Sequence, residues 1–286
     1  MPTRLTRPGK HTLIIEHPVM PMAGTAGFGD EYAGLLDLTA FGALVTNPVT
    51  TAPRSPANGA RVIPLAAGAL VHTGLPNPGL RSVLTDHAEV WARLTIPIIV
   101  HFAPVSLEDL RRALGKLDEA EHVAGVEIGL EDEIPQAEAV ALTREAARAE
   151  KPALIRLPFG APMDMVRAVA DAGADALVLS APPRGTARDA GGRLVTGRIL
   201  GPMNHPLALR HVGQAAQISN APVIAAGGIH SAAGAQDFLD AGAVAVQLDS
   251  LVWVQPSAVA AIVSALADPT ATGAVAEPGE GWPPAQ

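Results

Sequence analysis

Short apolar segments alternate with amphipathic ones along most of this chain. Eight of the apolar segments are β-prone and short enough to be buried strands, at residues 18–23, 43–46, 96–102, 123–128, 153–157, 176–179, 223–225 and 243–248. A helical segment or a long loop follows each of them. This alternation predicts a parallel sheet, and eight repeats favour a (β/α)8 TIM barrel, an α/β fold, as a single domain. A doubly wound open sheet is the alternative, but no G-x-G-x-x-G motif opens an early helix.

The segments between the strands complete this outline. Helical spacing is present at residues 32–38, 80–94, 107–117, 137–149, 163–172, 207–218, 232–241 and 258–267. Residues 12–16 predict a short strand of an N-terminal hairpin that closes one end of the barrel. Residues 47–79 and 180–203 are expected to be long loops, and such loops are usually functional. We therefore assign residues 1–267 to the barrel, and residues 268–286, rich in Pro, Gly and Ala, to a flexible, disordered tail.

Composition excludes several classes of function. The net charge is −8 and the Lys and Arg residues form no runs, which argues against nucleic acid and anionic membrane surfaces as partners. The chain contains no cysteine, so disulfides, thiolate metal sites and a cysteine base are excluded. No apolar run approaches the roughly 18 residues of a membrane helix, and no signal peptide is recognisable. We expect a cytoplasmic protein.

The chemistry of a (β/α)8 barrel lies where its strands end. In this chain the strand ends carry Gly24-Thr25, Asn47, His101, Gly129, Arg156, Ser180, Gly227-Gly228 and Asp249-Ser250, with the acidic run 131–133 just beyond Gly129. The arrangement predicts a polar barrel mouth with an acidic run on one side. Gly227-Gly228 stands between a strand and a helix, where it is either a phosphate cradle or an ordinary tight turn.

Several motifs point to a known family. They are the segments 18–29 (PVMPMAGTAGFG), 42–46 (GALVT), 74–79 (GLPNPG), 201–202 (GP), 222–229 (PVIAAGGI) and 241–247 (AGAVAVQ). Over about residues 18–254 the chain resembles the dihydroorotate dehydrogenases, FMN-dependent (β/α)8 barrels, and most closely the class 1 enzymes. The resemblance implies an oxidoreductase of pyrimidine metabolism with FMN as cofactor, and by analogy a homodimer.

The same resemblance identifies the candidate FMN contacts and shows where this chain departs from the family. The candidates are Ala23, Gly24, Thr25, Asn47, Arg156, Gly201, Gly227, Gly228 and Ser250. The family has lysines where this chain has Asn47 and Arg156, and a Gly-Thr pair where it has Asp249-Ser250. None of the three lysines of this chain lies at a predicted strand end, so none replaces the family pair.

Asp249 is the departure with the largest expected effect. A carboxylate about 5 Å from a phosphate, at an effective dielectric near 20, is repelled by roughly 3 kcal/mol per unit of phosphate charge. That corresponds to about a hundredfold or more in affinity. The repulsion would be relieved if Asp249 pointed away or paired with Arg198, which stands in place of a family glycine.

The substrate side of the site is altered as well. The family places asparagines where this chain has Val71-His72, Gly129 and Ser180-Ala181, and a Cys or Ser base near Asp132. The candidate catalytic residues are therefore Asp132 as base, Arg156 as a cation beside the flavin, and His101. Alternatively, Asp132 belongs to a solvated acidic loop before a helix. Without these asparagines, we do not expect dihydroorotate to be an efficient substrate.

Three functions remain open from the sequence. The first is a divergent FMN enzyme with weakened or altered cofactor binding. The second is a non-flavin pseudoenzyme or binding protein on the same barrel. The third is a flavin-free lyase or metal-assisted enzyme that acts on a small anionic molecule, and it requires His101, Asp132 and Arg156 to form one cluster. Scattered histidines and acids give no metal-ligand spacing, so we assign no metal site.

Overall fold

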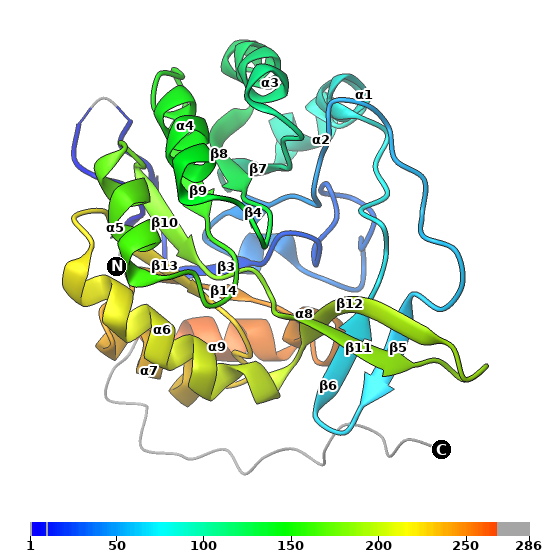
Figure 1. Ribbon diagram of the computed structural model, residues 1–286. Helices are drawn as coiled ribbons and strands as arrows, with labels where there is room; N and C mark the ends of the chain where they lie inside the picture. Colours follow the sequence, from blue (N-terminus) through cyan, green and yellow to red (C-terminus); the bar gives the residue numbers. More distant parts are fainter. Residues whose placement is uncertain (1, 10, 268–286) are drawn as a thin grey trace.

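Eight parallel strands form the centre of the molecule (Figure 1). The computed structural model describes residues 2–9 and 11–267. The sheet order is β3-β14-β13-β10-β9-β8-β7-β4, so barrel strands that follow one another in the chain are neighbours in the sheet. Its two end strands are β3 and β4. The Gly42 N–H donates to the carbonyl of Val19 at 2.8 Å, which joins the β4 side to β3. The predicted (β/α)8 barrel is confirmed.

The bounds of the barrel strands lie within two residues of their predicted positions. They are β3 (Val19–Pro21), β4 (Leu44–Val45), β7 (Ile98–Phe102), β8 (Val123–Gly129), β9 (Ala153–Arg156), β10 (Ala176–Leu179), β13 (Val223–Ala226) and β14 (Ala245–Leu248). Their near-continuous apolar character reflects burial on both faces, as a barrel enclosed by helices requires.

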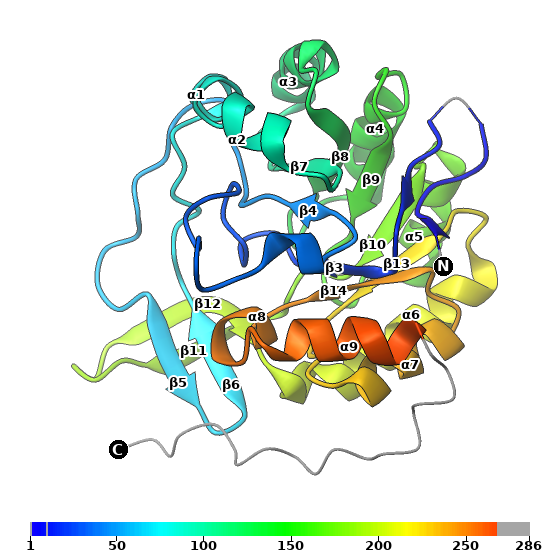
Figure 2. The same ribbon diagram turned by 180° about the vertical axis from the view of Figure 1, so that it is seen from behind.

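Helices surround the strands in both views (Figures 1 and 2). They are α1 (Leu80–Asp86), α2 (Ala88–Arg93), α3 (Leu107–Glu119), α4 (Gln136–Ala146), α5 (Met163–Asp171), α6 (His205–Ile218), α7 (Ala232–Asp240), α8 (Leu251–Val254) and α9 (Ala258–Ala267). The first turn of α3 shows how sequence sets these elements, because the Ser106 hydroxyl accepts the Asp109 N–H at 3.1 Å as an N-cap.

Two helix predictions are corrected. Residues 32–38 form turns followed by the 3-10 helix η1 (Leu38–Ala40), because Gly34 adopts φ +81° and interrupts the helical backbone. The helix expected over 80–94 is divided in two at His87, whose backbone leaves the helical region at φ −103° and ψ 0°. The His87 ring stacks on Phe28 with centroids 5.0 Å apart.

The two segments expected to be loops together form a second sheet. Strands β5 (Val62–Leu65) and β6 (Gly68–Val71) come from the first segment, and β11 (Arg184–Arg188) and β12 (Leu194–Leu200) from the second. The order is β11-β12-β6-β5 with antiparallel pairing throughout. Figures 1 and 2 show this sheet at the side of the barrel, next to α8. Because both segments follow barrel strands, it lies at the carboxyl face, where the site is expected.

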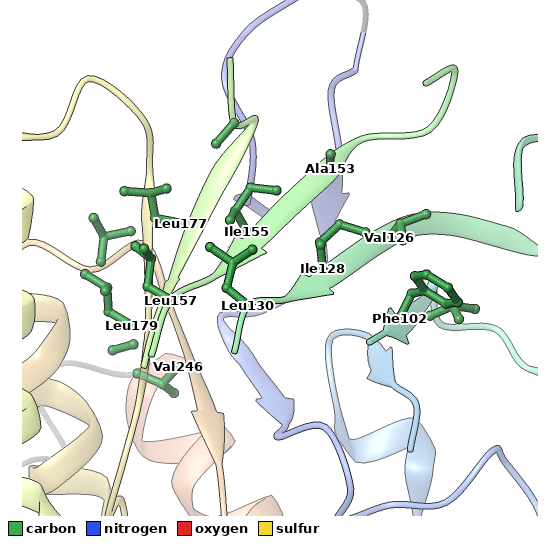
Figure 3. Close-up of a cluster of buried hydrophobic side chains, with 14 of the residues drawn as sticks. Phe102, Val126, Ile128, Leu130, Ala153, Ile155, Leu157, Leu177, Leu179 and Val246 are labelled. Carbon is green, nitrogen blue, oxygen red and sulfur yellow. The ribbon is translucent and has the colours of Figure 1, made fainter. Parts of the chain in front are cut away.

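An N-terminal hairpin closes the opposite end, as predicted. Strand β1 (Thr3–Arg4) pairs antiparallel with β2 (Ile14–Ile15). Leu5, Leu13 and Ile15 are buried and pack in one cluster with side chains of the barrel interior, namely Met20, Ala43, Val45, Ile99, Leu154, Ala176, Val178, Ile224 and Ala245. Side chains on alternate positions of the same strands pack outward against the helices, and Figure 3 shows part of that second cluster.

The structure says nothing about the tail assignment, because residues 268–286 lie outside the described part. Within residues 2–9 and 11–267, none of the helices has the length and apolar character needed to cross a membrane.

Candidate functional site

A buried polar network lies inside the barrel at the carboxyl ends of four strands. The Arg156 Nη1 donates to Oε1 of Glu127 at 2.9 Å and to Oε1 of Gln247 at 3.0 Å. The Gln247 Nε2 donates to Oε2 of Glu127 at 2.6 Å, and Nδ1 of His101 lies 2.8 Å from Oε1 of Glu127. Glu127 is therefore the centre of the network. It is fully buried, and Arg156 is 4% exposed.

Strand alternation explains why these side chains meet. Val126 and Ile128 of β8 pack in the outer cluster, so Glu127 between them points into the barrel. Gln247 of β14 lies between Val246 and Leu248 of the outer cluster and points inward for the same reason. The sequence-based prediction considered the residues at and after each strand end, so it did not include Glu127 or Gln247. The signal available was a charged or amide residue in the middle of an otherwise apolar strand.

The network keeps Glu127 ionised. Burial opposes the charge of the carboxylate, but the Arg156 guanidinium and the hydrogen bonds from His101 and Gln247 outweigh it and lower the pKa of Glu127 to about 2. Glu127 and Arg156 thus form a buried ion pair that further hydrogen bonds from His101 and Gln247 support.

His101 occupies the space beside Gly129. A Cβ atom built on Gly129 would lie 2.7 Å from Nε2 of His101, so any side chain at 129 would displace this ring. Gly129 and the histidine on the adjacent strand are therefore coupled, because the imidazole fills the space where a side chain at 129 would start.

Asp132 is held by other partners. Its carboxylate accepts from Nε of Arg184 at 2.5 Å and from Nη1 of Arg198 at 2.5 Å, both on the second sheet. The same Arg198 Nη1 donates to the carbonyl of Pro182 at 2.8 Å. Glu131 and Glu133 on either side are exposed. The carboxylate that contacts His101 and Arg156 is Glu127, so these contacts do not form the cluster of His101, Asp132 and Arg156 that the lyase hypothesis requires.

The Gly-Gly turn at residues 227–228 binds the carboxylate of Asp249. Gly227 and Gly228 have φ values of +131° and +70°. The Gly228 N–H donates to Oδ2 of Asp249 at 3.0 Å, and the Ser250 N–H donates to Oδ1 at 2.6 Å. Nε2 of His230 lies 3.3 Å from Oδ1 of Asp249 and 3.0 Å from the Ser250 hydroxyl.

Asp249 is therefore buried as a carboxylate rather than directed to solvent. It is 1% exposed. Burial opposes its ionisation, but the His230 ring and the two backbone N–H groups outweigh burial and lower the pKa of Asp249. Pairing with Arg198, one of the two ways by which the repulsion could be relieved, is not formed, because Arg198 contacts Asp132 instead. The turn is a poor phosphate site, since the Gly228 N–H and the nearby Ser250 N–H are already bound to an internal negative charge.

Comparisons with known proteins bear on this geometry. The family model described as dihydroorotate dehydrogenase matches residues 11–130 and 184–269. A protein of Pelobacter propionicus named dihydroorotate dehydrogenase B (NAD(+)), catalytic subunit, is 34% identical over 266 residues, 86% of this chain and 87% of that one. A protein of the same name from Desulforudis audaxviator is 34% identical over 89% of both chains. The chain belongs to the dihydroorotate dehydrogenase family.

A solved structure of the same fold supports the architecture. The crystal structure of a dihydroorotate dehydrogenase from Eimeria tenella in complex with ferulenol superposes with a TM-score of 0.72 at 18% identity. The superposition covers 88% of this chain and 80% of that one. The likeness extends over most of both molecules and shows that they share the barrel fold.

The other candidate residues of this dihydroorotate dehydrogenase family member lie around the barrel mouth. Thr25 is buried, and its hydroxyl donates to the Met22 carbonyl at 2.7 Å, so it stabilises the turn that contains Ala23 and Gly24. Gly201 lies against β6, where an added Cβ would be 2.6 Å from Gly68 Cα. The roles of these residues in cofactor binding stay predictions.

Two strand-end side chains at the mouth carry unpartnered polar atoms. In the described part of the chain, Oδ1 of Asn47 and Oγ of Ser180 are buried without a hydrogen-bond partner. Each adjoins the buried network. The Ser180 carbonyl accepts from Nη2 of Arg156 at 3.3 Å. The hydroxyl of Thr46, the residue before Asn47, accepts a hydrogen bond from the backbone N–H of His101 at 3.1 Å. Buried polar atoms of this kind are completed by an ordered water, an ion or a ligand.

Residues suitable for a metal ion are dispersed. Within residues 2–9 and 11–267, no three His, Asp or Glu side chains are placed together as a metal-binding group. No observation on these residues therefore favours the metal-assisted hypothesis.

Proposed function

We propose that this chain is a divergent oxidoreductase of the dihydroorotate dehydrogenase family in which FMN binding is weakened and dihydroorotate is not an efficient substrate. Family membership and the names of its relatives support the reaction class. The burial of Asp249 in the Gly-Gly turn, with its carboxylate accepting the Gly228 and Ser250 N–H groups, carries the proposal for the cofactor.

The size of the effect follows from Coulomb's law. At about 5 Å and an effective dielectric near 20, each unit of phosphate charge is repelled by roughly 3 kcal/mol. A phosphate also has to compete for backbone donors that Asp249 already uses. We expect FMN affinity to be reduced by about a hundredfold or more relative to a barrel with a small neutral residue at this position.

The substrate side supports the second part of the proposal. Asn47 replaces one family lysine, and Arg156, in place of the other, shares its guanidinium with Glu127 and Gln247. Gly129 brings no amide to the mouth. Arg184 and Arg198 pair with Asp132 and offset part of the charge of the acidic run 131–133. A small anionic molecule is the proposed ligand. We also propose a cytoplasmic protein, without nucleic-acid or membrane partners, that forms a homodimer by family analogy.

The absorbance spectrum of freshly purified protein is the test. We expect little or no flavin band near 450 nm after purification, a weak response to added FMN, and slow dihydroorotate oxidation even at saturating FMN. Protein that retains one FMN per chain through gel filtration and oxidises dihydroorotate rapidly would overturn the proposal.

A non-flavin binding protein is the second candidate, and one observation favours it. Groups that would bind a cofactor already make hydrogen bonds within the protein. Arg156 donates to Glu127 and Gln247, and the Gly228 N–H donates to Asp249. Failure to bind any flavin up to millimolar concentration would favour this candidate over the oxidoreductase.

A further inference from the structure

We propose that His101 is the proton-accepting residue of the barrel mouth and that Glu127 positions it. The inference rests on the proposed function and deepens it, because a dehydrogenation beside a carbonyl releases a proton that a group of the site has to accept. It assigns separate roles to the two nitrogen atoms of one imidazole ring, and a role to a carboxylate inside the barrel.

The contact with Glu127 decides which nitrogen of His101 carries the proton. Nδ1 of His101 lies 2.8 Å from Oε1 of Glu127. Because Glu127 is ionised, its oxygens only accept hydrogen bonds, so Nδ1 is the donor. Arg156 contacts the same oxygen at 2.9 Å and already balances the charge of Glu127. A neutral imidazole that donates from Nδ1 carries its free lone pair on Nε2.

Nε2 lies on the side of the ring that faces the carboxyl end of the barrel. Glu127 and Gly129 are two residues apart on β8, so they belong to the same inward-facing row, and Gly129 is nearer the strand end. Nδ1 contacts Glu127, whereas a Cβ built on Gly129 would lie 2.7 Å from Nε2. In the described part of the chain, Nε2 makes no hydrogen bond, yet it is not one of the buried unpartnered polar atoms, so solvent reaches it.

The surroundings of Nε2 suit a proton acceptor. Gly129, the residue beside it, is half-buried and lines a cavity between the loops that follow β7 and β8. The charged side chains next to the ring are Glu127 on β8 and Arg156 on β9, which offset each other. On the other side, after β4, the contact is the uncharged hydroxyl of Thr46. No cation or anion beyond this pair therefore fixes the charge of the imidazole.

Two measurements on the full-length protein without ligand test the state of His101. Long-range proton–nitrogen NMR spectra of 15N-histidine-labelled protein at pH 7 should show a proton on Nδ1 and none on Nε2. Diethyl pyrocarbonate, which acylates an unprotonated ring nitrogen, should modify His101 and not His211. These two residues are similarly buried, at 7% and 9% exposure. In His211, however, Nε2 contacts the Ala161 carbonyl at 2.9 Å, and Nδ1 is buried without a partner.

Deuterium exchange tests the proton transfer itself, and the step balances without an oxidant. Nε2 takes the proton of a C–H bond beside a carbonyl, the electron pair of that bond stays on the substrate as an enolate, and in D2O a deuteron returns to the carbon. The wild type should exchange the C–H hydrogens beside the ring carbonyl of millimolar dihydroorotate, followed by proton NMR. The rate should rise with pH through the range in which imidazoles titrate.

Histidine variants show whether the exchange depends on this ring. His101→Gln should lower the exchange rate by about a hundredfold or more, as the loss of a general base does. His122→Gln is the matched control, because His122 precedes β8 at the opposite end of the barrel, and it should leave the rate unchanged.

Two variants test the positioning of the ring. Gly129→Ala places a methyl group against Nε2 and should lower the exchange rate by about tenfold or more, because the ring has to move. Glu127→Gln should lower the rate and also change the NMR signature, because the amide can donate to Nδ1 and so move the ring proton to Nε2. A merely structural Glu127 would leave the protonated nitrogen unchanged. If Glu127→Gln does not fold, Gly129→Ala and the wild-type spectra decide.

The outcomes separate this inference from the proposed function. A proton on Nε2 at pH 7, no exchange in the wild type, or undiminished exchange in His101→Gln overturns the inference. A larger loss in Asp132→Asn than in His101→Gln also overturns it, because Asp132 would then be the base. None of these results concerns FMN affinity. Conversely, tight FMN binding with rapid dihydroorotate oxidation overturns the proposed function and leaves the assignment of His101 intact.

Discussion

Replacing Glu127 with Gln should destabilise the fold strongly although the side chain keeps its size. The pKa of Glu127 falls from 4.5 to about 2, and at 1.36 kcal/mol per pKa unit this corresponds to about 3 kcal/mol. Removing the carboxylate also leaves Arg156, 4% exposed, as a buried charge without its partner. Breaking a buried pair in this way typically costs about 3–5 kcal/mol. We therefore expect E127Q to lose about 3 kcal/mol or more.

Urea denaturation at pH 7, followed by circular dichroism and tryptophan fluorescence, measures this loss. Glu121→Gln, at an exposed position, is the matched control and should stay within about 0.5 kcal/mol of the wild type. The double variant E127Q/R156Q should lose less than the sum of the single variants, because it removes the unpaired guanidinium. A loss below about 1 kcal/mol for E127Q, or strict additivity, would refute the role assigned to this pair.

The dependence on pH gives the same prediction a second measurement. Because the folded-state pKa of Glu127 is depressed, its contribution to stability is fully present above pH 4.5 and is lost as the pH falls toward 2. The difference in unfolding free energy between wild type and E127Q should therefore shrink across this interval. A difference that stays constant from pH 5 to pH 2.5 would contradict the assigned ionisation.

Two smaller predictions concern the mouth. Asp132→Asn should change the unfolding free energy by about 1 kcal/mol or less, because Arg184 is 62% and Arg198 31% exposed in side-chain area; a loss above 2 kcal/mol in urea denaturation would be inconsistent with a solvent-screened pair. Gly228→Ala should lower the melting temperature well beyond Gly160→Ala. Both glycines have φ near +70°. An added Cβ at 228 would lie 2.6 Å from the backbone nitrogen of His205, whereas an added Cβ at 160 would have no neighbour within 4 Å. Equal melting temperatures would show that this close approach is relieved.

The barrel was predictable because its signal is local and repeated. Apolar runs such as 153–157 and 243–248 are bounded by turns and helices, and each reports its own strand. The second sheet was not predictable in the same way. Strands β6 and β12 lie more than 120 residues apart in the chain, and none of the residues of β11 (RGTAR) is buried, so its sequence resembles that of a loop. Neither of two distant segments carries a local signal that identifies the other as its partner.

The site was predicted in part. Strand ends led to Arg156, His101 and Asp249, but not to their partners, because an inward-facing Glu127 or Gln247 inside an apolar strand looks like an isolated polar exception. The orientation of Asp249 was open in the sequence, where pointing away or pairing with Arg198 was expected to relieve the repulsion. Only the three-dimensional arrangement shows that His230 and two backbone N–H groups hold it.

The sheet beside the barrel is assembled from two insertions that depend on each other. Strand β12 pairs with β11 along one edge and with β6 along the other, and Gly201 and Gly68 meet beside β6 with no room for a side chain. Neither insertion can therefore be shortened, swapped or grafted onto another barrel alone without leaving an open edge that invites association between chains. Grafting this sheet onto another barrel therefore requires both segments, residues 47–79 and 180–203, because each supplies strands that pair with those of the other.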